Sequence, residues 1–590
     1  MLGIKVELKD AEKAKSFILS NDLMDKEYYH VKDKTHICFA VKQKFSLNSS
    51  VNPLNKFKFE FVDMKFPKSN IKGSLKDNLS KLLTEKEMDF VKTSHDTIGS
   101  IAIIEVPKDL IKKEKLIADT LIKINPQIKT VLKKAAIHDG VYRTQKLKFL
   151  AGVNTKETIY KENGVQIKLD VEKVYFSIRL SNERKRVSEQ IKKNEEILVL
   201  FSGCAPYPLV LARNSKARHI TGVEINPLGH KYGLDSVRLN NIHNITLVNS
   251  DVKKFSKNPY QHLIGLKCSL KKEDMATRLR KNPQIMEIHL FDNDLDPKNI
   301  PLFEKRVTEL KNKGIEVFFH VPFRIDGKAY AIDNDRVVEF LKNLGGLCKK
   351  HFISSVIHLH SEASSINEQA VLAKVKELSN YYDYFYFETL TMSFDTQESI
   401  MKIAKSAGFK NICVDINHLY ITYKNNKKIV SVIKEIQNNF NTYFHVADHD
   451  PKTHTREVGK GPIDFKTILP LVNKGVIEVK SKDESKPKES LNSYANLKKY
   501  SKTAPKKYDR IIMPAPHDAH KFLDDTLKFA KKGTIIHYYD FLELNKIDTA
   551  LKQIEKACKK HKLKHKVLDV VKCGQHSPYV YRICVDFKIV

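Results

Sequence analysis

The pattern of a parallel α/β sheet begins near residue 196 and breaks off after its third strand, and this interruption constrains the fold most. Three apolar runs alternate with helix-like stretches between residues 196 and 251, as in the first half of a doubly wound sheet. The fourth run of this kind appears only at residues 509–513. We therefore expect a split α/β domain, residues 191–255 and 505–590, that carries an inserted domain.

The insert has its own rhythm of short strand and amphipathic helix, which predicts a (β/α)8 TIM barrel over residues 259–480. The expected strands are 264–269, 286–291, 315–320, 355–360, 384–389, 411–415, 442–446 and 475–479. Both ends of such a barrel meet on one face, as a tolerated insertion requires. Residues 481–507 are rich in Lys and Ser and are interpreted as a tether back to the first sheet.

The N-terminal part reads as two small α+β domains. Residues 1–65 and 95–190 each alternate between strand and helix patterns, and the lysine-rich stretch 66–95 between them has the composition of a linker.

Charge and composition favour a cytoplasmic protein with a polyanionic partner. Lys and Arg number 103 against 70 Asp and Glu, a net charge of +33, which suits nucleic acid; a lysine-rich proteome or a salty cytoplasm is the alternative. The eight cysteines form no CxxC pair, which indicates a reduced compartment. No apolar run is long enough to cross a membrane, and the first residues carry charges at every second or third position instead of the apolar core of a signal peptide, so we expect no secretion and no membrane partner. The sequence leaves the oligomeric state open, and we expect a monomer.

A nucleoside-binding turn is predicted at the carboxyl edge of the first sheet. Phe201, Ser202 and Gly203 follow the first strand, where a small residue lets the backbone approach a ligand. Glu224 ends the second strand, from which a carboxylate can bind both ribose hydroxyls, and Asp251 follows the third. A dinucleotide-binding domain is the rival interpretation, but the turn lacks GxGxxG.

Ionisable residues follow successive strands of the predicted barrel. They are His320, His360, Glu388, Asp415, His418, His445 and Glu478. Barrel active sites form at these strand ends, and mixed nitrogen and oxygen ligands suit Zn, Mn or Fe. We predict a divalent transition metal, Zn or Mn, in the barrel.

Several short motifs, in order, resemble the archaeal and eukaryotic tRNA guanine-37 N1-methyltransferases. Residues 174–184, VYFSIRLSNER, are similar to the VYFSPRL…ER signature of that family. Further matches are KTVLKK (129–134), YRT (142–144), LAG (150–152), EINP (224–227), VRLN (237–240) and IIHYY (535–539). The resemblance covers residues 1–255 and 505–590 and implies a class I (Rossmann-like) methyltransferase that uses S-adenosyl-L-methionine and binds tRNA.

The resemblance also implies roles for individual residues. Glu183 matches the base that takes the N1 proton of guanine, and Arg143 the cation that stabilises charge on O6. The residues expected to bind the cofactor are Tyr175, Phe176, Ser177, Arg179, Phe201, Ser202, Gly203, Glu224, Asn226, Asp251 and Pro514.

Three departures from the family pattern keep other activities open. Val199 replaces an acidic residue, Ala205 replaces the second glycine, and Pro514 stands where the family carries Asn of Asn-Leu-Pro-Lys. His517 or a backbone carbonyl is expected to replace that Asn. The alternatives are aminocarboxypropyl transfer in wybutosine synthesis and a non-catalytic RNA-binding protein with a decayed core.

The insert resembles the xylose isomerase-like and endonuclease IV-like barrels. The matching segments are FHVPF (319–323), VDINH (414–418) and GKGPID (459–464). The resemblance implies a metal quartet of Glu388, Asp415, His445 and Glu478, with His320 and His360 at a second metal position. A phosphodiesterase, a sugar isomerase or epimerase, and an inactive relic that holds RNA all fit this superfamily.

Overall fold

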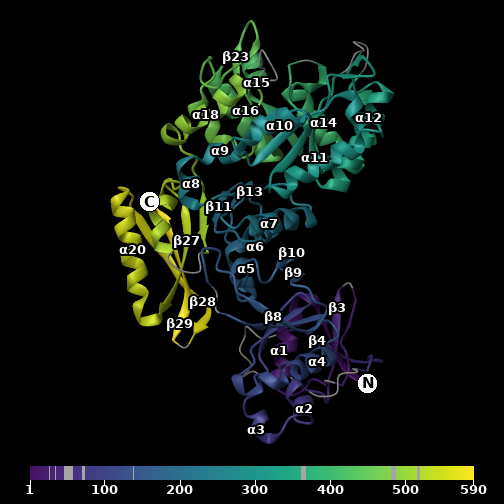
Figure 1. The fold of residues 1–590 in the computed structure, drawn as a ribbon, viewed down its shortest axis with the longest axis vertical. Helices are drawn as coiled ribbons and strands as arrows, with labels where there is room; N and C mark the ends of the chain where they lie inside the picture. Colours follow the sequence, from purple (N-terminus) through teal and green to yellow (C-terminus); the bar gives the residue numbers. More distant parts are fainter. Residues whose placement is uncertain are drawn as a thin grey trace. The chain divides into compact units, whose positions relative to one another are not determined.

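The computed structural model describes most of the chain and divides it into two compact units (Figure 1). The described residues are 1–25, 27–33, 35–45, 57–68, 74–136, 139–360, 367–391, 393–479, 487–514, 519–577 and 579–590. Unit 1 comprises Met1–Ile137 and Lys146–Lys156, and unit 2 comprises His138–Gln145 and Glu157–Val590. No helix within these residues is both long and apolar enough to span a bilayer.

Unit 1 contains two four-stranded sheets, each with its own core. The first has the order β2-β3-β1-β4 and the second the order β5-β6-β7-β8. The first comprises β1 (Leu2–Glu7), β2 (Val31–Lys32), β3 (His36–Ala40), β4 (Phe59–Asp63) and helix α1 (Ala11–Ser20). The second comprises β5 (His95–Ile98), β6 (Ile101–Ile104), β7 (Thr130–Lys134), β8 (Leu147–Gly152) and helices α2 (Leu75–Leu79), α3 (Glu85–Met88) and α4 (Glu114–Ile124).

The stretch expected as a linker, 66–95, is part of the second small domain from residue 74 onward. Helices α2 and α3 each begin with a capping box, at Ser74 and at Thr84. Leu75 and Leu79 are buried in the same core as Leu121 of α4. Lys76 of α2 and Lys86 of α3 are exposed, whereas the two leucines of α2 face this core.

The expected end of the middle domain at residue 190 is also too late. The hairpin of β9 (Glu157–Glu162) and β10 (Val165–Asp170) belongs to unit 2. The backbone of β10 donates two hydrogen bonds to helix α7 (Pro227–Leu239) and its C-cap. They run from Lys168 to the Ser236 side chain at 2.9 Å and from Gln166 to the side chain of the C-cap residue Asn240 at 2.8 Å.

The split α/β sheet of unit 2 has seven strands in the order β13-β12-β11-β26-β27-β29-β28. Its strands are β11 (Glu196–Leu200), β12 (His219–Glu224), β13 (Ile245–Asn249), β26 (Arg510–Met513), β27 (Ile535–Glu543), β28 (His565–Ser577) and β29 (Val580–Ile589). Its helices, besides α7, are α5 (Ser181–Glu189), α6 (Pro206–Asn214), α8 (Val252–Lys257), α19 (Leu523–Leu527) and α20 (Ile547–Lys560). Strand β26 runs parallel to β11, with Leu198 opposite Ile511, so the late strand completes the interrupted sheet as predicted (Figure 1).

The insert is a closed barrel of eight parallel strands, which confirms the predicted TIM barrel. The strands are β14 (Ile264–Cys268), β15 (Ile285–His289), β16 (Glu316–His320), β19 (Ser354–Ile357), β20 (Phe385–Glu388), β21 (Asn411–Asp415), β22 (Asn441–Val446) and β25 (Gly475–Ile477). Its outer helices include α10 (Lys272–Leu279), α11 (Ile300–Asn312), α12 (Asp335–His351), α13 (Glu368–Glu377), α14 (Gln397–Ala407), α15 (Ile416–Tyr423), α16 (Asn426–Asn439) and α17 (Phe465–Ile468). Side chains fill the interior, where Phe318 stacks on Tyr443 at 4.1 Å between ring centroids.

The expected tether, 481–507, instead forms a further outer helix of the barrel over most of its described length. Helix α18 (Lys488–Thr503) buries Tyr494 and Leu497 in the barrel core. The Tyr494 hydroxyl donates to the carbonyl of Gln261 at 2.7 Å, close to where the insert begins. Because α18 runs back along the barrel, it returns the chain to the face from which the insert started.

The barrel contacts the domain of the split sheet through the face at which the barrel strands begin. His230 of α7 hydrogen-bonds the carbonyl of Gly314 at 3.0 Å, and the Asn249 backbone donates to Gln284 at 2.9 Å. Gln284 directly precedes strand β15, and Gly314 lies two residues before strand β16. The carboxyl ends of the strands, where barrel sites form, therefore lie away from this contact.

Candidate functional site

A cavity of about 610 Å³ lies at the carboxyl edge of the split sheet. Phe201, Glu224 and Asp251, which follow or end three neighbouring strands, all line it. The turn after β11 has positive φ at Phe201 (54°), Gly203 (55°) and Ala205 (66°). Such conformations cluster at ligand sites, and Ala205 adopts one even though the family glycine is absent.

Hydrogen bonds hold the polar residues of this edge in place. The two carboxylate oxygens of Glu224 accept from the backbone N–H of Gly203 and of Asn226, each at 2.7 Å. Burial raises the pKa of Glu224. Asn226 and Asp251 cap helices α7 and α8 through their side chains. Each oxygen of the Glu224 carboxylate has a second lone pair that can accept a hydrogen bond from a ligand hydroxyl.

The segment 174–184 forms the facing wall of the cavity. Tyr175, Phe176 and Ser177 line it as expected, together with Arg184. Arg184 is buried and donates two hydrogen bonds to Glu162, of 2.5 and 2.6 Å, and one to the Ser177 carbonyl at 3.2 Å. This bidentate pair fixes the wall against the β9–β10 hairpin.

Most of the expected cofactor residues are brought together in this one cavity. Asn226, Ser202, Gly203 and Pro514 line it, whereas Arg179 is not among the described residues that do. Arg143 also lines it, from a loop in which Val141 is 76% exposed. His517, expected to replace the family Asn, lies outside the described residues.

The expected base, Glu183, is buried behind the cavity wall, and the described residues that line the cavity do not include it. Arg186 donates to both of its carboxylate oxygens at 2.7 Å, and the Tyr539 hydroxyl donates to Oε1 at 2.6 Å. Tyr539 in turn accepts from the hydroxyl of Tyr207, a cavity-lining residue, at 3.0 Å. Sequence reasoning missed Tyr207, and it used Tyr539 only as part of a matching motif.

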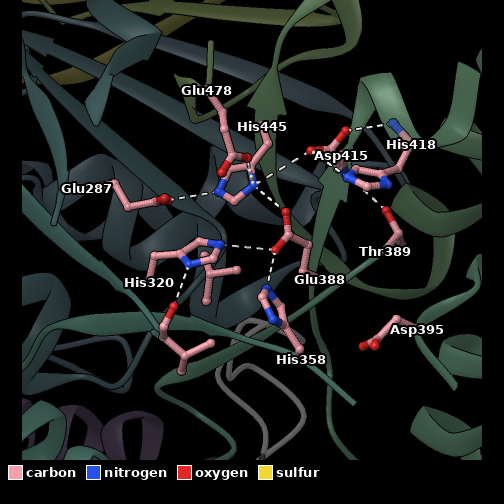
Figure 2. Close-up of polar contacts among 12 residues, drawn as sticks. Glu287, His320, His358, Glu388, Thr389, Asp395, Asp415, His418, His445 and Glu478 are labelled. Carbon is pink, nitrogen blue, oxygen red and sulfur yellow. Dashed lines mark hydrogen bonds and ion pairs between the residues drawn. The ribbon is translucent and has the colours of Figure 1, made fainter. Parts of the chain in front are cut away.

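A second cavity, of about 550 Å³, opens at the carboxyl ends of the barrel strands. Glu388, Asp415, His445 and Glu478 offer ligand atoms that all lie within 4.8 Å of one another. Glu388 belongs also to a second such group, with His320 and His358. Figure 2 shows Glu388 between the two groups.

Glu388 uses a different oxygen for each group. Its Oε1 lies 2.5 Å from His445 Nδ1, and its Oε2 lies 3.1 Å from His320 Nε2 and 2.7 Å from His358 Nε2. A carboxylate in this position can bridge two cations.

Two of the expected ligands lie outside these groups. His360 pairs through Nδ1 with Asp395 at 2.7 Å. His358, and not His360, belongs to the second group of possible ligands. His418 lines the cavity, but its Nε2 lies 3.3 Å from His454 Nε2 and 4.0 Å from Asp415. The sequence has histidines at both 358 and 360, and alternation along a strand puts both on one side, so the pattern could not separate them.

Sequence reasoning also missed Glu287, a fully buried carboxylate on β15. It accepts from His445 Nε2 at 2.9 Å and lies 3.1 Å from Lys267 Nζ. Because the carboxylate engages Nε2, Nδ1 of His445 is directed at Glu388. Carboxylates of this kind orient metal-bound histidines and raise their basicity.

The electrostatics of the group match a cation site. Burial raises the pKa of Glu388, but His445, His320 and His358 outweigh it and hold that pKa well below its usual value. Burial and the neighbouring Glu478 and Glu388 raise the pKa of Asp415 well above its usual value. These closely packed carboxylates therefore need positive charge beside them. Protons supply that charge here, and a divalent metal can take the place of the protons.

Comparison with known proteins identifies the family of the split chain. The TRM5/TYW2 methyltransferase domain model matches residues 158–312 and 495–568, and the TYW2 N-terminal domain model matches residues 75–155. Trm5b of Pyrococcus abyssi, a tRNA (guanine(37)-N(1))-methyltransferase, is 29% identical over 318 residues, 54% of this chain and 92% of that protein. Taw22 of Nanoarchaeum equitans, a tRNA (guanine(37)-N(1))/4-demethylwyosine(37)-methyltransferase, is 32% identical over 315 residues, 49% of this chain and 93% of that protein. The chain therefore belongs to the TRM5/TYW2 methyltransferase family and carries a closed (β/α)8 barrel as an insert.

Proposed function

We propose that this protein is a methyltransferase that uses S-adenosyl-L-methionine to modify N1 of guanine 37 in tRNA. The observation that carries the proposal is the cavity in which Arg143 and the 174–177 wall face the carboxyl ends of three parallel strands. The printed activities of the Pyrococcus and Nanoarchaeum relatives support the same acceptor. The net charge of +33 supports tRNA as the partner, and the eight free cysteines support a cytoplasmic location.

The donor set of the cavity fits the cofactor. Glu224 would hold the ribose hydroxyls, Asp251 the adenine edge, and the Gly203 turn the methionine end. When bound, S-adenosylmethionine supplies an electrophilic methyl group on sulfur. Phe176 and Phe201 line the same space, and their rings would help to exclude water around the bound cofactor.

The residues of this chain would make the guanine nucleophilic. Guanine N1 carries a proton, so it attacks a methyl group only as that proton leaves. Arg143 would stabilise the negative charge that grows on O6, and Glu183 would take the proton.

Nucleoside mass spectrometry of tRNA treated with the protein and S-adenosylmethionine tests this function. We expect N1-methylguanosine at position 37 and an about 10²–10⁴-fold slower reaction for Glu183→Gln, the range for loss of a positioned base. Glu189→Gln, an exposed position on the same helix α5, is the matched control and should react at the wild-type rate. Equal rates for Glu183→Gln and wild type would remove Glu183 from the chemistry.

A second acceptor deserves the same assay, because the Nanoarchaeum relative is described as acting on 4-demethylwyosine as well. We expect tRNA that carries 4-demethylwyosine to gain a methyl group in parallel reactions. Aminocarboxypropyl transfer, the remaining alternative, would add a larger group and leave a different adenosine product, so the same mass spectra distinguish it.

We also infer that the barrel binds a divalent transition metal, Zn or Mn. Glu388, Asp415, His445 and Glu478 would form one position, and His320, His358 and Glu388 a second. Mixed imidazole and carboxylate donors at a barrel mouth support this assignment.

Elemental analysis of protein purified without chelator tests the metal assignment. We expect at least one metal per chain in the wild type and in Glu377→Ala, a half-exposed surface control on the outer helix α13. Glu388→Ala, which removes the shared carboxylate, should lose the metal. Equal metal content in all three proteins would contradict the assignment.

A further inference from the structure

The position of Glu183 raises the question of how the N1 proton reaches it. The inference below rests on the methyl transfer proposed above. Methylation at N1 releases a proton inside the cavity, and the expected base is buried behind the wall rather than on it. A path must therefore connect the cavity with the carboxylate.

Two tyrosine hydroxyls provide a continuous path. Tyr207, in the first turn of α6, lines the cavity and is 2% exposed, and Tyr539, on β27, is 1% exposed. The Tyr207 hydroxyl donates to the Tyr539 hydroxyl at 3.0 Å, and the Tyr539 hydroxyl donates to Glu183 Oε1 at 2.6 Å. Both hydrogen bonds point the same way, from the cavity toward the carboxylate.

We propose that Tyr207 and Tyr539 relay the N1 proton of guanine to Glu183. In this step N1 bonds to the methyl carbon as the carbon–sulfur bond breaks, and the sulfur keeps that electron pair. The N1 proton passes to the Tyr207 oxygen, the Tyr207 proton to Tyr539, and the Tyr539 proton to Glu183. The products are methylated guanine, S-adenosylhomocysteine and a neutral Glu183, and both tyrosines end as neutral hydroxyls.

The surroundings of Glu183 keep the acceptor end of the relay fixed. Arg186 binds both carboxylate oxygens and also donates to Asp586 at 2.7 Å. Asp586 accepts from His537 Nδ1 at 2.7 Å, and His537 Nε2 accepts from Arg510 at 2.8 Å. Because arginine only donates, this order fixes the histidine tautomer.

Guanine N1 becomes strongly acidic as the methyl group is transferred to it, so its proton moves along the relay late in the step.

Two isosteric variants interrupt the relay without changing the packing. Tyr207→Phe and Tyr539→Phe each remove one hydroxyl and keep the ring. We expect single-turnover methylation of tRNA to slow by about 100-fold or more in each, within the range for assisted proton transfer, with S-adenosylmethionine affinity unchanged. We also expect the curved proton inventory of the wild type in mixed H₂O and D₂O to become linear in both variants.

Tyr508→Phe is the matched control. Tyr508 is equally buried in the same domain, and its hydroxyl contacts Thr221 at 3.4 Å, outside the relay. We expect this variant to keep the wild-type rate and the curved inventory, although it also loses a buried hydroxyl.

The outcomes separate this inference from the proposed function. Wild-type rates and inventories in Tyr207→Phe and Tyr539→Phe, alongside a slow Glu183→Gln, would overturn the relay and leave the methyltransferase assignment standing. A wild-type protein that leaves tRNA unmethylated would overturn the proposed function and the relay together.

Discussion

Replacing Glu162 with alanine should strongly destabilise the methyltransferase domain. Arg184 is 1% exposed, and its two shortest hydrogen bonds, of 2.5 and 2.6 Å, both go to Glu162. In the variant the guanidinium keeps its hydrogen bond to the Ser177 carbonyl, at 3.2 Å, and its position over the Phe176 and Tyr207 rings, but no carboxylate of the described residues pairs with it. Removing one partner of a buried ion pair costs about 3–5 kcal/mol, because the other charge stays buried and uncompensated. For a domain of this size each kcal/mol lowers the Tm by about 2–4 °C, so we expect a fall of roughly 6–20 °C.

Scanning calorimetry of the full chain, with and without S-adenosylmethionine, measures this effect. The variant should also bind the cofactor more weakly, because Arg184 and Ser177 line the cavity. The double variant Glu162→Leu with Arg184→Met should regain most of the stability, since apolar groups of similar volume often replace a buried pair without loss. A Glu162→Ala protein that melts within about 2 °C of wild type would refute the reasoning, because this corresponds to less than about 1 kcal/mol.

Three further predictions follow from the two sites. Arg143→Ala should lower kcat/KM for tRNA, with a loss of about 2–4 kcal/mol in transition-state stabilisation. Wild-type turnover in this variant would count against the role of Arg143 at O6. Glu287→Gln should weaken metal binding by about 10–100-fold in competition with a chelator, because the charged acceptor of His445 Nε2 is lost; unchanged affinity would exclude a supporting role. Glu388→Ala should leave tRNA methylation at the wild-type rate, because the barrel contacts the methyltransferase domain through the opposite end of its strands. A methylation defect in that variant would show that the two sites are coupled.

The sequence predicted the architecture well because apolar runs and their spacing report directly on buried strands. All eight barrel strands begin and end within three residues of the expected ranges, and the late strand at Arg510–Met513 joins the split sheet, where it pairs with β11. Residues 66–95 and 481–507, expected to be a linker and a tether, were misassigned for a different reason. Helices α2 and α18 present few apolar residues in lysine-rich sequence, so composition resembled that of a linker even though Leu79 and Leu497 are fully buried.

The candidate sites were predictable only at the level of strand ends. Periodicity places a side chain on the correct side of a strand, but it does not give its height above the barrel, which is what separates His358 from His360. Glu287 was missed because a single Glu within an apolar strand carries no motif. The Glu183 side chain is held by Arg186 and by Tyr539. Because Tyr539 is distant in sequence, no local sequence pattern could predict this contact.

The most direct test of the central claim is nucleoside analysis of tRNA after incubation with the purified full chain and S-adenosylmethionine. We expect N1-methylguanosine at position 37 in the wild-type reaction and in that of Glu189→Gln, and strongly reduced amounts with Glu183→Gln. Unmodified tRNA in the wild-type reaction, from protein that binds S-adenosylmethionine by calorimetry, would contradict it.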